Sequence, residues 1–221
     1  MGLRIITPPT KTPIEMFATS DATEEKSGSD LGLEAIKNHL RHAIDVEEED
    51  SLILAYVDAA WEYCQQYTWR TFLETTYQLS LPHWFAQDDT CGLSQRRIVL
   101  PKPPVIHGSS IVVAYTDSEG ESQTMAATEY VVDWTADLVT VRPAVNACWP
   151  ELDDREDAVK ITYTAGYGDE PDDMPRLLLH AVKLLVGMYF ETREPEQHRS
   201  TTVDSLLAML CVRDDRLACV I

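Results

Sequence analysis

The sequence predicts an α+β fold, in which a helical bundle carries an inserted antiparallel β subdomain, with an extended N-terminal segment and a C-terminal arm. In residues 31–70 and 172–193 apolar side chains recur every three or four positions, the spacing of helices that bury one face. Between them, residues 71–171 hold short runs in which apolar and polar residues alternate, as in half-buried strands. The flanking ranges are 1–30, an extended segment with an acidic loop, and 194–221, an arm with a short helix.

The predicted helix over residues 50–70 is the element on which the others are expected to pack. At 3.6 residues per turn, Ile53, Val57 and Cys64 fall on one apolar face, and Glu62 falls on the opposite polar stripe. The acids immediately before it lie where the helix dipole favours negative charge, so they mark its start. At 1.5 Å per residue the helix would be roughly 25 Å long, about the width of a small domain.

Before this helix, the chain is expected to be extended and then helical again. Pro8, Pro9 and Pro13 impose an extended path after a few strand-like residues. Residues 17–30 are polar and have the composition of a linker or loop. A short helix follows over residues 33–41, with an acid near its start and a base near its end.

Short strands are predicted after the central helix. They are expected around residues 77–81, 98–100, 111–115, 125, 129–133, 138–142 and 159–164. The PKPP run at 101–104 stops the strand at 98–100, and Gly120 indicates a hairpin turn after the strand at 111–115. Because no helical pattern separates these strands, we expect an antiparallel meander or a small sandwich.

The final long helix, predicted to begin at Pro175, is apolar around most of its circumference. Such a helix must be covered on several sides, and in a domain of this size part of that cover is expected from another subunit. The residues expected at this subunit interface are Leu177, Leu184, Val186, Met188 and Phe190.

Composition narrows the class of protein. The chain has 221 residues, with 18 Lys and Arg against 37 Asp and Glu, for a formal net charge of −19. A surface that holds DNA by neutralising phosphates needs an excess of cations, so such binding is not expected. The five cysteines form no C-x-x-C pair and indicate reduced thiols in a cytoplasmic setting. The longest apolar run, 177–190, is interrupted by His180 and Lys183 and is too short to cross a membrane.

No motif for catalysis or cofactor binding is recognised. The nucleotide loops, the G-x-S-x-G elbow and the H-E-x-x-H zinc motif are all absent from the sequence. His39 and His42 could share a metal, but a pair without further ligands favours a surface location. The acids at 169–173 lack the spacing of a calcium loop and suit a helix start. We therefore expect no catalytic residue, no metal and no cofactor, and the protein is not expected to be an enzyme.

The order of the segments resembles that of the head–tail connector (adaptor) proteins of tailed bacteriophages and prophages. The segments that carry this resemblance are ITPP with Pro13-Ile14 near the start, LEAIKNHLR at 33–41, YTWR at 67–70, LPKPPV at 100–105, YTDSEG at 115–120, WP at 149–150, VKITYTAGYG at 159–168 and the helix ending in YFETRE at 189–194. The chain departs from the family pattern at Trp69, where the family usually has Gly, in the acidic insertion at 17–30, and in the arm after Arg193.

The resemblance implies a structural virion protein located in the neck and, during assembly, in the host cytoplasm. Such proteins form a ring, typically of twelve copies, under the portal. The implied partners are other copies of the chain, the portal protein and a tail-completion or stopper protein, with no membrane. Genomic DNA would pass through the lumen without specific binding, and an acidic lumen suits this because like charges repel.

The C-terminal arm has two possible docking sites. Its apolar residues at helical spacing and its apolar tip are Val203, Leu206, Leu207, Met209, Leu210, Val220 and Ile221. They could pack on the protein's own core or in a groove of a partner ring, since terminal segments fray unless something holds them. The resemblance favours the portal. On that interpretation a chain ending at Pro195 would fold and keep its melting temperature but fail to join the portal.

Two other classes of protein remain open from the sequence. A monomeric soluble binding module would form no ring under any condition. A small enzyme with an unrecognised site would show a pocket with strongly shifted carboxylates.

Overall fold

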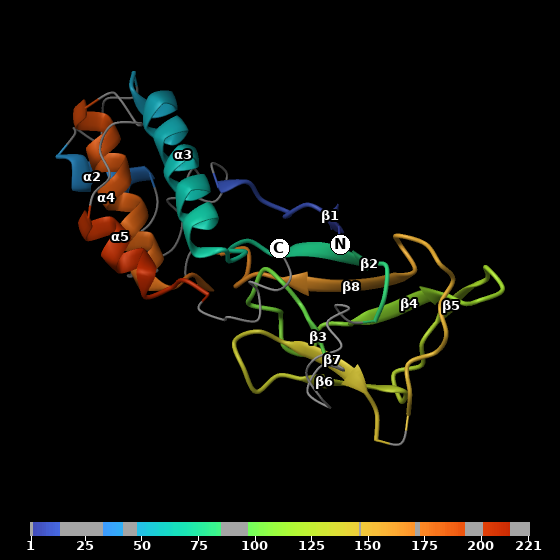
Figure 1. Ribbon diagram of the computed structural model, residues 1–221. Helices are drawn as coiled ribbons and strands as arrows, with labels where there is room; N and C mark the ends of the chain where they lie inside the picture. Colours follow the sequence, from blue (N-terminus) through green and yellow to red (C-terminus); the bar gives the residue numbers. More distant parts are fainter. Residues whose placement is uncertain are drawn as a thin grey trace. The chain divides into compact units, whose positions relative to one another are not determined.

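The computed structural model describes the chain over residues 2–13, 33–41, 48–84, 97–145, 147–170, 173–192 and 201–212. The chain forms two compact units. The strand unit comprises Met1–Pro8, Glu74–Gly166 and Val212–Ile221, and the helix unit comprises Pro9–Leu73 and Tyr167–Cys211. The predicted α+β class, with an antiparallel β subdomain inserted between helices, is confirmed (Figure 1).

The strand unit contains two antiparallel sheets. The five-stranded sheet has, in spatial order, β1 (Gly2–Thr7), β2 (Thr75–Leu81), β8 (Val159–Ala165), β4 (Val112–Thr116) and β5 (Ser122–Thr124). The three-stranded sheet has the order β3 (Ile98–Val99), β7 (Thr140–Pro143) and β6 (Tyr130–Asp133). A simple meander is therefore wrong, because β8 inserts between β2 and β4, whereas β4–β5 and β6–β7 are true hairpins.

Apolar and polar residues alternate along β2 and β8, and this alternation decides which face of the large sheet is buried. Leu79 pairs with Ile161, which pairs in turn with Val113 of β4, and all three side chains are fully buried. Strand residues between them point to the other face and are half-buried. The hydroxyl of buried Tyr163 donates to the carbonyl of Pro101 at 2.7 Å, so this polar atom is satisfied inside the core.

The helix unit contains α2 (Leu33–Leu40), α3 (Asp50–Thr68), α4 (Arg176–Thr192) and α5 (Thr201–Ala208). The predicted face of α3 is confirmed, since Ile53, Val57 and Cys64 are fully buried against α4 and its neighbours. Pro175 lies just before α4, and its carbonyl accepts a hydrogen bond from the Leu179 N–H at 3.2 Å. Proline is well suited to the start of a helix, because the first backbone N–H groups of a helix have no acceptor within it and proline has no N–H.

Trp69 ends α3 in the left-handed conformation, with φ 60° and ψ 20°. This is the position after a helix where glycine is preferred, because a side chain there costs roughly 1–2 kcal/mol. Glycine at this place would avoid that cost. The Trp69 side chain remains 42% exposed in the structure.

Gly168 cannot accept a side chain without a rearrangement. Its φ is +149°, and a Cβ added there would lie 2.3 Å from Oδ2 of Asp173. We expect Gly168→Ala to lower the free energy of unfolding by about 1–3 kcal/mol, the usual cost of backbone strain of this kind. Urea unfolding measures this change. Gly120→Ala is the control, because Gly120 also has a positive φ of +84° but no atom within 4 Å of the added Cβ; an equal loss in both variants would contradict the contact argument.

Cys64 is expected to be chemically inert in the folded protein. Burial raises the pKa of its thiol to about 12, because the thiolate would lie in the apolar core. Exposed Cys148 should therefore react with a thiol reagent at pH 8, whereas Cys64 should react only after unfolding. The pKa of the Cys64 thiol is higher in the folded state than in the unfolded state. The stability that the buried neutral thiol contributes is therefore complete below the unfolded pKa of about 8.5, and it is lost as the pH rises toward 12. Mass spectrometry of labelled peptides shows which cysteine has reacted. Rapid labelling of Cys64 in the native protein would contradict its burial.

Candidate functional site

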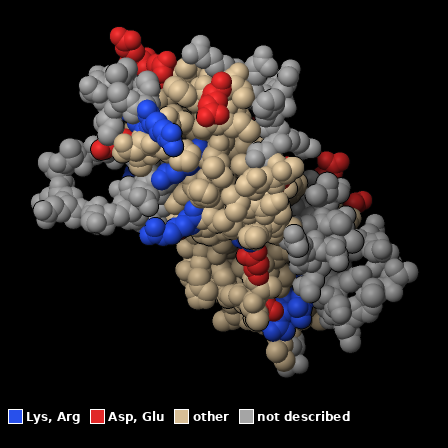
Figure 2. Space-filling view, turned by 90° about the vertical axis from the view of Figure 1, so that its left-hand side faces the viewer, with Lys and Arg blue, Asp and Glu red and all other residues tan. Residues whose placement is uncertain are grey.

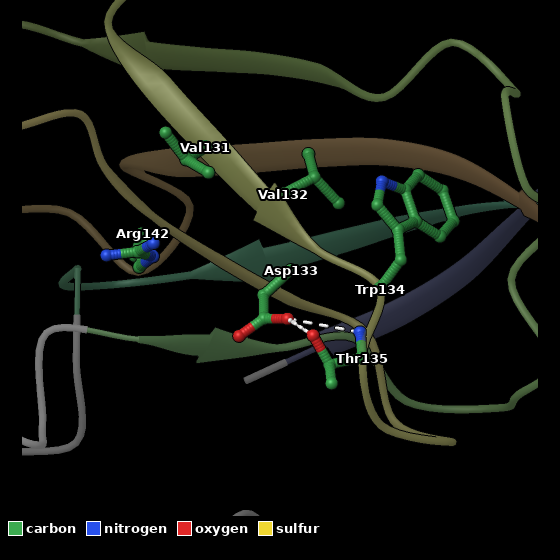
Figure 3. Close-up of a pocket in the computed structure, with 6 residues that line it drawn as sticks. All are labelled: Val131, Val132, Asp133, Trp134, Thr135 and Arg142. Carbon is green, nitrogen blue, oxygen red and sulfur yellow. Dashed lines mark hydrogen bonds between the residues drawn. The ribbon is translucent and has the colours of Figure 1, made fainter.

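The strand unit has a shallow surface hollow of about 530 Å³ at the end of β6. It is lined by Val131, Val132, Asp133, Trp134, Thr135 and Arg142 (Figure 3). Oδ1 of Asp133 accepts hydrogen bonds from the Thr135 N–H at 3.1 Å and from the Thr135 hydroxyl at 2.6 Å. These bonds, with a smaller contribution from Arg97 and Arg142, lower the pKa of Asp133. A carboxylate held in this way stays charged and caps the turn, so it is poorly suited to act as a general base.

The described residues offer little for other chemistry. No group of three or more His, Cys, Asp or Glu side chains in these ranges is placed to hold a metal ion. No helix in the described part of the chain is long and apolar enough to cross a membrane.

Charge is dispersed on the face drawn in Figure 2. There, Lys and Arg lie in small separate groups beside acidic residues and broad uncharged areas. Several basic side chains are also neutralised locally. In the strand unit, Asp157 accepts contacts from Arg155 at 2.6 Å and Lys160 at 2.9 Å, and both lower the pKa of Asp157, Lys160 most. Basic groups paired in this way are less available to DNA phosphates.

Four of the five residues expected at a subunit interface on α4 are not fully buried. Leu177, Leu184, Met188 and Phe190 are half-buried, and the last three pack partly on the helix-unit core. Val186 is an error of the prediction, because it is fully buried inside the helix unit. It lies on the side of α4 that belongs to the apolar core, and such a residue cannot meet a neighbouring subunit.

The arm residues on α5 are placed differently from the portal-arm prediction. Val203 is 2% exposed and Leu207 is fully buried, and both belong to the helix-unit core. For these two residues the portal-binding interpretation is corrected in favour of packing on the protein's own core. The physical reason is that α3 and α4 are apolar over more surface than they cover for each other, so α5 fills the remaining side.

Polar contacts also hold α5 and the residues after it. The Tyr63 hydroxyl donates to Oδ1 of Asp204 at 2.8 Å, which joins α3 to α5. Beyond the helix, Nε of Arg70 donates to the Leu210 carbonyl at 2.5 Å, and Sγ of Cys211 lies 3.3 Å from the Tyr67 carbonyl oxygen.

The other arm residues are more accessible or lie outside the description. Leu206 and Leu210 are half-buried, whereas Met209 is 76% exposed. Val220 and Ile221 lie outside the described residues.

The helix unit carries an inserted antiparallel strand unit and leaves apolar side chains such as Met209 exposed on its surface. No family model matches the chain, and no curated protein matches it.

Solved structures do match the chain. One chain in the virion of the native gene transfer agent (GTA) particle shares 23% sequence identity with it, at a TM-score of 0.67. Chains in the neck of the empty GTA particle computed with C6 symmetry and in the neck of the native GTA particle computed with C12 symmetry match at 22% and 21% identity, with TM-scores of 0.65 and 0.63. Each match covers 97% of both chains. The fold of a particle neck protein, which the motif order predicted, is thereby confirmed.

One exposed element was not recognised as a surface from the sequence. Strand β1 pairs with β2, more than sixty positions later in the chain, and leaves Leu3, Ile5 and Ile6 exposed. The alternation of its residues is too short to reveal a partner strand. A signal was present in the cluster of large aliphatic side chains so close to the N-terminus.

Proposed function

We propose that this chain is a structural protein of the neck of a phage-like particle, where it acts as the head–tail connector. In this role it forms a ring, of twelve copies, under the portal. The ring extends the DNA channel and presents a docking surface to the tail or to a stopper protein. The observation that carries the proposal is the match of fold over 97% of both chains to chains from the GTA neck and virion structures.

The symmetry of those necks supports a ring. They were computed with C6 and C12 symmetry, and twelve copies of one chain satisfy both. In a ring each copy contacts the next through two different surfaces, so the chain needs two complementary patches rather than one self-complementary patch. The half-buried apolar residues of α4 are the proposed first patch.

The net charge supports a channel rather than a DNA-binding surface. A formal charge of −19 opposes the release of counterions that drives phosphate binding. DNA that moves through the ring would then meet repulsion at short range and few cations that could hold it.

Contact with the portal is proposed for the exposed end of the arm. Met209 follows α5 and is the most exposed apolar side chain of that region. Together with Leu206, Leu210, Val220 and Ile221, it forms the part of the predicted portal-binding arm that remains after Val203 and Leu207 are assigned to the core.

Electron microscopy of particles made without this protein tests the proposal. Removing the gene should yield filled heads that lack tails and lose DNA, and adding purified protein to these heads should restore a ring under the portal. The free protein is expected to be monomeric, so the heads are the necessary template. Normal tailed particles without the protein would refute the connector role and favour a binding module or an enzyme.

Leu177→Asp tests the proposed subunit interface. Leu177 is half-buried at the second residue of α4 and is not among the residues packed on the helix-unit core, so the fold should tolerate Asp. An unpaired charge buried in an interface costs several kcal/mol, so we expect ring formation on heads to fall at least tenfold. Arg176→Asp is the control, because Arg176 is exposed next to it. Circular dichroism checks folding, and normal incorporation of Leu177→Asp would remove α4 from the interface.

A further inference from the structure

The edge strand β1 exposes apolar side chains that belong to the buried face of its sheet. Leu3 pairs with Leu79 and Ile5 pairs with Tyr77, and residues opposite each other in an antiparallel pair point to the same face. Leu79 is fully buried and Tyr77 is 6% exposed, but Leu3 is 38% exposed and Ile5 54%. The buried face of the sheet therefore extends beyond the core that the described residues supply.

The outer backbone edge of β1 is also open. Within the described ranges β1 pairs with β2 alone, and it is the first strand in the sheet order. A strand edge with free N–H and C=O groups and exposed aliphatic side chains binds a further strand readily. The open edge and the uncovered side chains lie on the same six-residue strand, so a single added strand would satisfy both.

The chain itself contains a segment of matching chemistry. Residues 217–221 read LACVI, five consecutive apolar residues that include two β-branched ones. Val212 already belongs to the strand unit, which also holds β1. Residues 213–216, RDDR, carry two positive and two negative charges and span up to roughly 14 Å when extended, enough for a tether.

A short tether gives its end an effective concentration in the millimolar range, far above that of another molecule in dilute solution. In the free protein, a chain's own segment therefore has the advantage over a second copy.

We propose that residues 217–221 dock along β1 of the same chain in the free protein and cover Leu3 and Ile5. The site is a resting position for the tip of the arm. In the proposed function, on which this step rests, the portal binds Val220 and Ile221. The portal must therefore first remove these two residues from β1. Docking on β1 thus keeps residues 217–221 from binding elsewhere until the portal is present.

Disulfide trapping in the full-length protein tests the docking directly, because Cys219 lies within the segment. Leu3→Cys and Ile5→Cys are each made with Cys148→Ser, which removes the exposed thiol of the part of the chain that the structure describes. After mild oxidation at micromolar concentration, we expect at least one of the two variants to form an intramolecular bond to Cys219, identified by mass spectrometry. Val145→Cys is the matched control, since Val145 is an apolar residue of the strand unit that is 82% exposed.

The outcomes separate the two proposals. Absence of the bond in both variants, equal bonding in the control, or a bond formed only between two molecules would overturn the docking on β1. As a second measurement, Val220→Asp with Ile221→Asp should raise hydrogen exchange at the β1 amides at least fivefold, and unchanged exchange would also count against it. If the bond forms and the oxidised protein still joins filled heads as well as the reduced protein does, the portal role of the tip fails while the β1 site stands.

Discussion

A chain that ends at Pro195 is expected to lose about 3–6 kcal/mol of unfolding free energy in its helix unit. This truncation removes Val203 and Leu207, and burying one such aliphatic side chain contributes about 1.5–3 kcal/mol. It also removes Asp204, the acceptor for Tyr63. Since whole domains are stable by only about 5–15 kcal/mol, the truncated helix unit should be marginal or unfolded at 37 °C. Urea unfolding followed by circular dichroism measures the loss.

A pair of point variants tests the same argument without removing the arm. Leu207→Ala should cost about 2–5 kcal/mol, the usual range for a buried leucine, whereas Met209→Ala should stay within about 0.5 kcal/mol. The two positions are two residues apart, but Leu207 is fully buried and Met209 is 76% exposed. A truncated chain with unchanged stability, or equal effects of the two substitutions, would restore α5 to the portal-binding arm.

Asp50→Ala is expected to destabilise the helix unit by about 3 kcal/mol, because it removes a carboxylate partner of the buried Lys37 ammonium in a low-dielectric setting. Lys37 on α2 is 3% exposed, and its Nζ lies 2.5 Å from Oδ1 of Asp50, the first residue of α3. The Asp50 side chain is 24% exposed, so the lower end of the usual 3–5 kcal/mol range applies. The change in unfolding free energy is measured by urea titration.

Two further variants separate the ion pair from other effects. Glu48→Ala removes an exposed acid near the same helix start, so it reports the helix dipole alone, about 0.3–1 kcal/mol. Replacing both partners, Lys37→Met with Asp50→Leu, should recover most of the stability, since the buried ammonium is removed together with this carboxylate. A double variant as unstable as Asp50→Ala would mean that packing around this pair, and not the loss of the ion pair, causes the destabilisation.

Local pattern was enough to predict the elements of this protein. The spacing of apolar residues placed α3 and α4 within one or two residues of their observed ends, and alternation located β2 and β8. Period is a property of the segment itself, so it can be read without knowing the partner. The order of short motifs likewise predicted the fold of a phage neck protein, and the match to chains of the GTA neck and virion structures confirms that fold.

Tertiary structure decided which apolar residues are surfaces and which are core. Val186 and Met188 both lie on α4, but only the first is fully buried, and the sequence could not distinguish them because the helix is apolar nearly all round. Leu207 is buried by contacts with segments far away in the chain. Leu3 stays exposed although its strand pairs with β2, which is also far away in the chain. Which partner an apolar side chain meets depends on such long-range contacts, and the spacing along one segment carries no record of them.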